Sequence, residues 1–119
     1  MQNFAYAVCM DSRERVHVAE LFKVLMHPER LAILEMLRDG ERCVCEIEEA
    51  LDLRQAYVSQ QLSVLRNAGL VESRRDKWRI IYRLTSSDVL TLIYSAQALC
   101  ERPAPQPVAV QKYLGETSC

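Results

Sequence analysis

The chain has 119 residues, of which 50% are hydrophobic and 26% charged, and its formal net charge is −1. This length suits one domain with a modest core, and no apolar run approaches the ~20 residues that a membrane span needs. No basic segment followed by an apolar block opens the chain, so we expect no secretion signal, no membrane partner and a cytoplasmic protein.

The charges are distributed unevenly along the chain. Residues 54–83 carry seven Arg or Lys side chains against two acidic ones, a net charge of +5, whereas residues 1–53 have a net charge of −5. A basic segment on an acidic body is typical of a protein that binds nucleic acid.

The first half of the chain predicts three helices. A potential capping box at Asp11 opens a helix over residues 12–26. Pro28, at a first helical position, starts a second apolar helix, which Asp39-Gly40 ends. A third, short helix is expected over residues 44–51.

The stretch 53–70 predicts the helix around which the rest of the chain is organised. Val58, Leu62 and Leu65 share one stripe and should face the core, and Gly69 ends the helix. The opposite face is rich in small and amide side chains, which suit the donor and acceptor edges of a DNA major groove. For this segment alone, an ordinary amphipathic surface helix is the alternative.

Residues 70–75 and 78–84 predict the two strands of a hairpin, with Asp76-Lys77 as its turn. Basic side chains cluster at the tip. In the second strand one face is formed by the alternating residues Trp78, Ile80, Tyr82 and Leu84.

A last helix is expected over residues 87–101, capped by Ser86 or Ser87. Its apolar stripe consists of Val89, Leu92, Ile93, Ala96 and Leu99. Three prolines set two residues apart then end regular structure, so we expect one domain over residues 1–102 and a C-terminal tail over residues 103–119.

Two short helices followed by a basic hairpin predict a winged helix-turn-helix. The chain resembles the ArsR/SmtB family of small bacterial repressors in the stretches LMHPERLAILEMLRDGERCVCEIEEAL and VSQQLSVLRNAGLVESRRDKWRIIYRL, which cover roughly residues 20–84. The resemblance implies a mainly α fold with five helices and a small β-hairpin wing, assembled as a homodimer through the first and last helices. It also implies a DNA-binding transcriptional repressor, not an enzyme, that leaves its double-stranded operator when an inducer binds.

Two sets of residues are expected at the operator. Those predicted to meet base edges are Gln55, Tyr57, Ser59, Gln60 and Ser63. Those predicted to meet phosphates or the minor groove are Arg74, Arg75, Lys77 and Arg79.

Cys43 and Cys45 form a C-x-C pair that flanks Val44 and Ile47, the residues expected to point inward. The pair resembles the CVC box of arsenite, cadmium and lead sensors in this family, although free cysteine is often just a small core residue. One arsenite-sensor pattern adds a third cysteine where Glu48 stands, so the chain departs from that pattern.

A third thiolate would have to come from Cys9, Cys119 or Cys100, in that order of preference. Cys9 is favoured because an N-terminal arm supplies the extra ligands of cadmium and lead sensors and would reach the box of the partner subunit. The zinc site that some relatives carry on the last helix is rejected, because Asp88 and Glu101 have no histidine beside them.

The inducer implied is arsenite or antimonite, As(III) or Sb(III), followed by Cd(II) or Pb(II), since thiolates discriminate weakly among soft ions. The alternative is a repressor that senses oxidants or persulfide through its thiols. Persulfide-sensing relatives pair a cysteine near Cys100 with one in the second helix, where Glu35 stands. A thiol oxidoreductase would need C-x-x-C in a strand–helix alternation, which the chain lacks.

On a regular helix, residues i and i+2 point about 200° apart. Cys43 and Cys45 can therefore reach one ion only if the first turn of the helix is loop-like or unwinds. Because this helix supports the stretch 53–70, we expect ion and operator to prefer different conformations.

Overall fold

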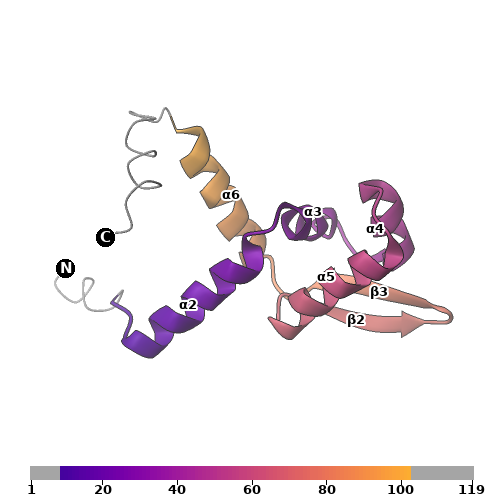
Figure 1. The fold of residues 1–119 in the computed structure, drawn as a ribbon, viewed down its shortest axis with the longest axis horizontal. Coiled ribbons are helices and arrows are strands. Elements are labelled where there is room, and N and C mark those ends of the chain that lie inside the picture. Colours follow the sequence, from indigo (N-terminus) through magenta and orange to yellow (C-terminus); the bar gives the residue numbers. More distant parts are fainter. Residues whose placement is uncertain (1–8, 103–119) are drawn as a thin grey trace. The chain divides into compact units, whose positions relative to one another are not determined.

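The computed structural model describes residues 9–102, in which five helices and three strands follow one another (Figure 1). The chain divides into two compact units, Met1–Ser87 and Asp88–Cys119. The first unit contains four helices and the sheet, and the second contains α6, Asp88–Glu101. The predicted tail, with Cys119, lies outside the described residues. No helix among the described residues is long and apolar enough to cross a membrane.

The four helices of the first unit follow the predicted order. They are α2 (Ser12–Leu25), α3 (Pro28–Met36), α4 (Val44–Leu51) and α5 (Gln55–Asn67). The predicted capping box is present at the start of α2, where the Asp11 carboxylate accepts a hydrogen bond from the backbone N–H of Glu14 at 2.8 Å. Pro28 begins α3 as predicted, but the helix ends at Met36, before Asp39-Gly40.

Gly69 ends α5, as predicted. Its φ of +80° lies in the left-handed region, which favours glycine because it has no Cβ. The N–H of Gly69 donates to the carbonyl of Arg66 at 2.9 Å, and the N–H of Leu70 donates to that of Leu65 at 3.0 Å. These two bonds satisfy carbonyls that the helix leaves open and turn the chain into the sheet.

The sheet has three antiparallel strands in the order β1-β3-β2. They are β1 (Arg42–Cys43), β2 (Val71–Asp76) and β3 (Arg79–Leu84). β1 pairs Arg42 with Tyr82 and Cys43 with Ile81, so the centre of the sheet is β3. The sequence did not predict β1, because a strand of two residues has no period to detect.

The predicted hairpin turn is wrong by one residue. Asp76 pairs with Arg79, so the turn is Lys77-Trp78, with Lys77 in the left-handed region at φ +60°. An ion pair of 3.6 Å between the Asp76 and Arg79 side chains closes the hairpin on this register.

Ile80, Tyr82 and Leu84 of the predicted alternating face lie in β3, but Trp78 lies in the turn, and burial does not follow this face. Trp78 and Ile80 are 80% and 41% exposed, whereas Ile81 and Tyr82 are both buried. The reason is position along the hairpin. Its tip projects past the helices (Figure 1), whereas the base of β3 is covered by β1 and α4.

The inward stripe of α5 is confirmed, since Val58, Leu62 and Leu65 are completely buried. Gln61 shares this stripe and is the only buried polar residue in the described part of the chain. Its side-chain oxygen accepts a hydrogen bond from Nε of Arg30, on α3, at 2.7 Å. A charge-assisted bond therefore fixes how α5 sits against α3.

Replacing Gln61 by Ala leaves Nε of Arg30 without its acceptor. We expect the variant to lose about 1–3 kcal/mol of unfolding free energy, because a partly buried charged donor loses its partner. Urea unfolding at one protein concentration measures this loss. The matched control is Gln60→Ala at the exposed neighbouring position, which should change the unfolding free energy by less than about 0.5 kcal/mol. Equal losses in both variants would contradict this assignment.

Candidate functional site

Helices α4 and α5 form the predicted helix-turn-helix. Asp52 ends α4 in the left-handed region at φ +55°, and the N–H of Leu53 donates back to the carbonyl of Glu48 at 3.2 Å. This turn presents one face of α5 to the surface. Of the residues predicted to meet base edges, four are exposed and Ser63 is partly buried; the exposed ones are Gln55, Tyr57, Ser59 and Gln60.

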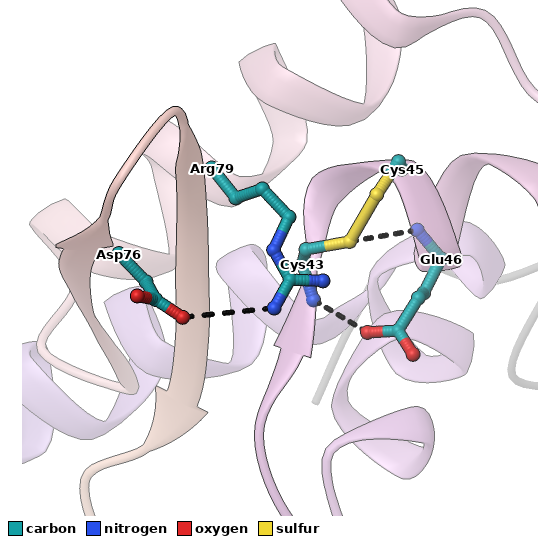
Figure 2. The surroundings of a disulfide bond; sticks show 5 residues. All are labelled: Cys43, Cys45, Glu46, Asp76 and Arg79. Carbon is teal, nitrogen blue, oxygen red and sulfur yellow. Dashed lines mark hydrogen bonds and ion pairs between the residues drawn. A yellow bond between two sulfur atoms is a disulfide. The ribbon is translucent and has the colours of Figure 1, made fainter.

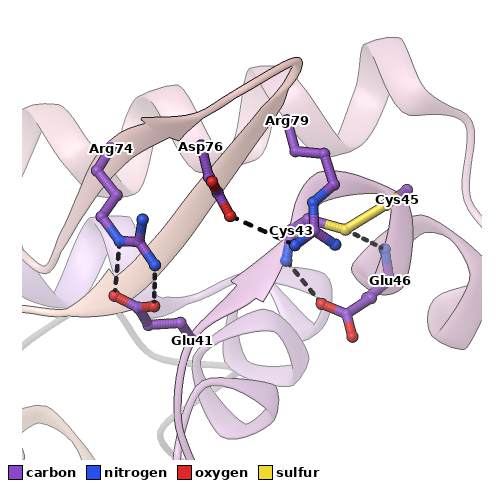
Figure 3. Close-up of polar contacts among 7 residues, drawn as sticks. All are labelled: Glu41, Cys43, Cys45, Glu46, Arg74, Asp76 and Arg79. Atoms are coloured by element: carbon purple, nitrogen blue, oxygen red, sulfur yellow. Dashed lines mark hydrogen bonds and ion pairs between the residues drawn. A yellow bond between two sulfur atoms is a disulfide. The ribbon is translucent and has the colours of Figure 1, made fainter.

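The basic residues of the hairpin fall into two groups. Arg74 forms a two-pronged ion pair with Glu41, in which Nη2 lies 2.6 Å from Oε1 and Nε 3.1 Å from Oε2 (Figure 3). Arg79 pairs with Asp76, whereas Arg75 and Lys77 have no ion-pair partner among residues 9–102. The four residues predicted to meet phosphates thus include two that are already paired and two that are not.

The Glu41–Arg74 pair joins the segment before β1 to β2. The hydrogen bond from Arg74 lowers the pKa of the Glu41 carboxyl below its ordinary value of 4.5 and raises the pKa of Arg74. Both side chains remain solvent-exposed, so the pair adds little to stability, but it fixes the position of Arg74.

Cys43 and Cys45 lie together at the start of α4, where the structure joins their sulfurs in a disulfide (Figure 2). Their Cα atoms are 5.3 Å apart. Cys43 is the last residue of β1 and is extended (φ −84°, ψ 163°), whereas Cys45 lies in the first turn of α4. The two sulfurs therefore meet because Cys43 lies outside the helix, which is the loop-like arrangement that the spacing demands, and no helical turn has to unwind.

Cys43 is also the N-cap of α4. Its sulfur accepts a hydrogen bond from the backbone N–H of Glu46 at 3.3 Å, and the Glu46 carboxylate accepts one from the N–H of Cys43 at 2.8 Å. Cys43 is only 1% exposed, whereas Cys45 is exposed. The expectation that Val44 points inward while both cysteines flank the core is wrong for Cys43, because this residue fills the core beside Ile47 and Val44 is only half-buried.

The sheet register places Arg79 on the face that carries Cys43. Cys43 pairs with Ile81, and Arg79, two residues from Ile81 along β3, projects from the same face. In Figures 2 and 3 the Arg79 side chain, which is paired with Asp76, extends from β3 toward Cys43. This placement could not be predicted from the sequence, because it depends on the pairing of β1 with β3.

The other thiols do not join this pair in the described part of the chain. Cys9 precedes α2 and Cys100 lies near the end of α6, and both are free and exposed. No group of three His, Cys, Asp or Glu side chains able to hold a metal ion occurs among residues 9–102. Within those residues, Cys43 and Cys45 thus supply two sulfurs and no third ligand.

The chain is similar to bacterial regulatory proteins. The family model described as "Bacterial regulatory protein, arsR family" matches residues 27–73. A biofilm growth-associated repressor of Agrobacterium fabrum is 44% identical over 87 residues, which are 73% of this chain and 74% of that protein.

Two solved structures extend the likeness to the fold. The crystal structure of Rv0081 from Mycobacterium tuberculosis has a TM-score of 0.69 and 37% identity, covering 78% of this chain and 93% of that one. The solution structure of the homodimeric winged helix-turn-helix DNA-binding domain Mb0332 from Mycobacterium bovis has a TM-score of 0.68 and 32% identity, covering 82% and 93% of the two chains.

Proposed function

The chain belongs to the arsR family of bacterial regulatory proteins, and from this premise we propose that it is a cytoplasmic DNA-binding repressor controlled by the Cys43–Cys45 thiols. The observation that carries the proposal is the position of Cys43. One residue caps α4, pairs with the central strand of the wing and supplies a sulfur to the thiol pair.

In this proposal α5 enters the major groove of the operator and the β2–β3 hairpin lies along the backbone. The exposed amide and hydroxyl side chains of α5 support the first contact, because they match base edges. Arg75 and Lys77 support the second, because they have no carboxylate partner in the described residues and are available to phosphates. Arg74 and Arg79 would first have to leave Glu41 and Asp76.

We further propose a homodimer that places two copies of α5 about one DNA turn apart. Large apolar side chains exposed on α2 and α6 support it, among them Val16, Phe22 and Leu99 at 54%, 51% and 64%. The homodimeric Mycobacterium bovis domain supports the same assembly.

The proposed inducer is a soft thiophilic ion, with As(III) or Sb(III) ahead of Cd(II) or Pb(II). Once the Cys43–Cys45 bond is reduced, two adjacent thiolates provide the soft donors that such ions prefer. A third sulfur is needed for a three-thiolate site, and we propose Cys9 of the partner subunit, with Cys119 and then Cys100 as alternatives.

The contacts of Cys43 suggest how the signal reaches the DNA. When its sulfur binds an ion, the hydrogen bond from the Glu46 amide weakens and the end of β1 shifts. β1 is paired with β3, so the wing moves with it, and α5 follows through its contact with α4. Ion and operator then oppose each other with a reciprocal coupling of about 1–3 kcal/mol.

A second candidate is a redox-controlled repressor, favoured by the bond between the two sulfurs. Forming it from two thiols releases two protons and two electrons. Hydrogen peroxide accepts them and is reduced to two molecules of water. The same residues would then respond to an oxidant without any third ligand.

The first prediction from this proposal concerns base readout. Gln60→Ala should cost about 1–3 kcal/mol of binding free energy and relax the preference at one base pair, because one amide contact is lost. The probe is a labelled duplex that the full-length wild-type protein selects from a random-sequence pool, and fluorescence anisotropy measures binding. An unchanged base preference would mean that α5 faces the DNA differently.

The second prediction concerns the phosphate contacts. Arg75→Ala should weaken binding to all duplexes similarly and reduce the slope of log K against log salt by about one. Arg83→Ala is the matched control on the same hairpin, because its guanidinium is held by Glu72 at 2.6 Å. If both variants reduce the slope equally, ion pairing does not decide which hairpin cations meet phosphates.

The third prediction concerns assembly. Leu92→Glu should split the dimer and abolish tight binding to the selected duplex, because it places a charge in an apolar contact. Thr91→Glu, at an exposed neighbouring position on α6, is the control. Sedimentation measures the assembly, and circular dichroism verifies that the helices persist. A folded Leu92→Glu monomer that binds the selected duplex as tightly as the wild type would refute the dimer.

The fourth prediction concerns the thiols. Cys43→Ser and Cys45→Ser should still bind the duplex but no longer leave it with arsenite or cadmium, and serine at position 43 keeps an N-cap oxygen. Cys9→Ser should weaken the response, and Cys100→Ser is the control that should respond normally. Anisotropy titrations under reducing conditions test each variant.

A parallel titration with hydrogen peroxide separates the two candidate inducers. Release by peroxide but by neither ion would favour the redox repressor. Normal release of Cys43→Ser by both ions would show that Cys43 serves packing alone.

A further inference from the structure

Trp78 is the chain's only tryptophan, and it is 80% exposed at the tip of the hairpin. Together with Lys77 it forms the two-residue turn between β2 and β3, at the end of the sheet farthest from the base that the helices cover. An indole is the largest apolar side chain and usually loses much of its surface to contacts. Among the described residues, the ring interaction that the structure shows is with one cation.

That cation is Arg79, whose guanidinium carbon lies 5.9 Å from the centre of the Trp78 ring. Arg79 is held in turn by Asp76 at 3.6 Å, so the cation near the ring is itself part of an ion pair. Arg75 and Lys77 place two more positive charges on the same tip. An exposed indole ring with positively charged side chains near it is complementary to a polyanion that also offers apolar surface.

We infer that the Trp78 indole is a DNA contact, which enters the minor groove of the operator and packs on deoxyribose and base edges. The inference rests on the proposed function and adds to it one residue, Trp78, as an apolar contact at the tip of the hairpin. A narrow, A·T-rich minor groove has the enhanced negative potential that attracts such a tip, and apolar side chains are used as wedges there. Arg75 and Lys77 then lie at the phosphates on either side of the ring.

The competing occupants are a second copy of this chain and an anionic membrane surface. The duplex is favoured because the tip belongs to the same unit as the exposed amide face of α5, so one rigid partner can meet both. The test is arranged so that each occupant gives a different result.

Because Trp78 is unique, its emission reports on this one site. The full-length reduced protein is titrated with unlabelled selected duplex, exciting at the red edge where the five tyrosines contribute least. We expect the free protein to emit at the wavelength of a water-exposed indole. As duplex is added, this emission should be quenched or shifted to shorter wavelength, and the change should saturate at the same duplex concentration as the anisotropy of the labelled duplex.

Two substitutions accompany the titration. Trp78→Ser should weaken binding about tenfold, because the apolar contact is lost, while Trp78→Phe should retain most of the affinity. Ile80→Ser, at an exposed apolar position farther from the tip, is the control and should bind as the wild type does. Because Trp78 is 80% exposed, thermal unfolding should be nearly unchanged in its two variants. Ile80 is 41% exposed and lies in β3, so Ile80→Ser is compared at a temperature at which it remains folded.

The outcomes separate this inference from the function on which it rests. If the wild type binds the duplex, but its emission is unchanged and Trp78→Ser binds equally well, the indole is not a contact and the repressor proposal stands. If the wild type selects no duplex, both fail. An emission that shifts with anionic vesicles and not with duplex, or that moves to the red only as the free protein is diluted, assigns Trp78 to a membrane or to another copy and overturns the inference.

Discussion

The pairing of β1 with β3 is the contact on which the proposed coupling depends. Two residues, Arg42 and Cys43, align with Tyr82 and Ile81 at the centre of the sheet. Through this register the start of α4 is tied to the wing, and the buried side chain of Cys43 is packed into the core. The exposed Glu41–Arg74 pair joins the segment before β1 to β2, the other strand of the wing. In the proposed mechanism, a small displacement of the Cys43 sulfur therefore reaches both elements that are proposed to meet DNA.

The parts of the fold that the sequence predicted are those with strong local signals. The capping box at Asp11, the proline at the start of α3, the stripe of α5 and Gly69 at its end all depend on residues within one or two turns of each other. Helix caps and the 3.6-residue period act over such distances, so no knowledge of the tertiary structure was needed.

The features that the sequence did not predict depend on partners far along the chain. β1 exists because β3, nearly forty residues later, offers it an edge. The burial of Gln61 agrees with its position on the stripe, but its acceptor role requires Arg30 from another helix. The hairpin turn lies one residue later than the sequence predicts. Lys77 adopts a left-handed conformation that glycine more commonly occupies, and Asp76 and Arg79 are paired across the turn. The C-x-C spacing predicted Cys43 and Cys45 as candidate ligands. That Cys43 also caps α4 and pairs with β3 could be seen only in the structure.

Hydrogen exchange in β3 tests most directly whether the thiols act through the wing. Backbone amide exchange across Arg79–Leu84 is compared in the full-length reduced protein with and without enough arsenite to release the selected duplex. We predict faster exchange in β3 and in the first turn of α4, while α3 stays protected, because the strand pairing loosens when the Cys43 sulfur is engaged. Release of the duplex with β3 exchange unchanged would contradict the account and place the signal path elsewhere.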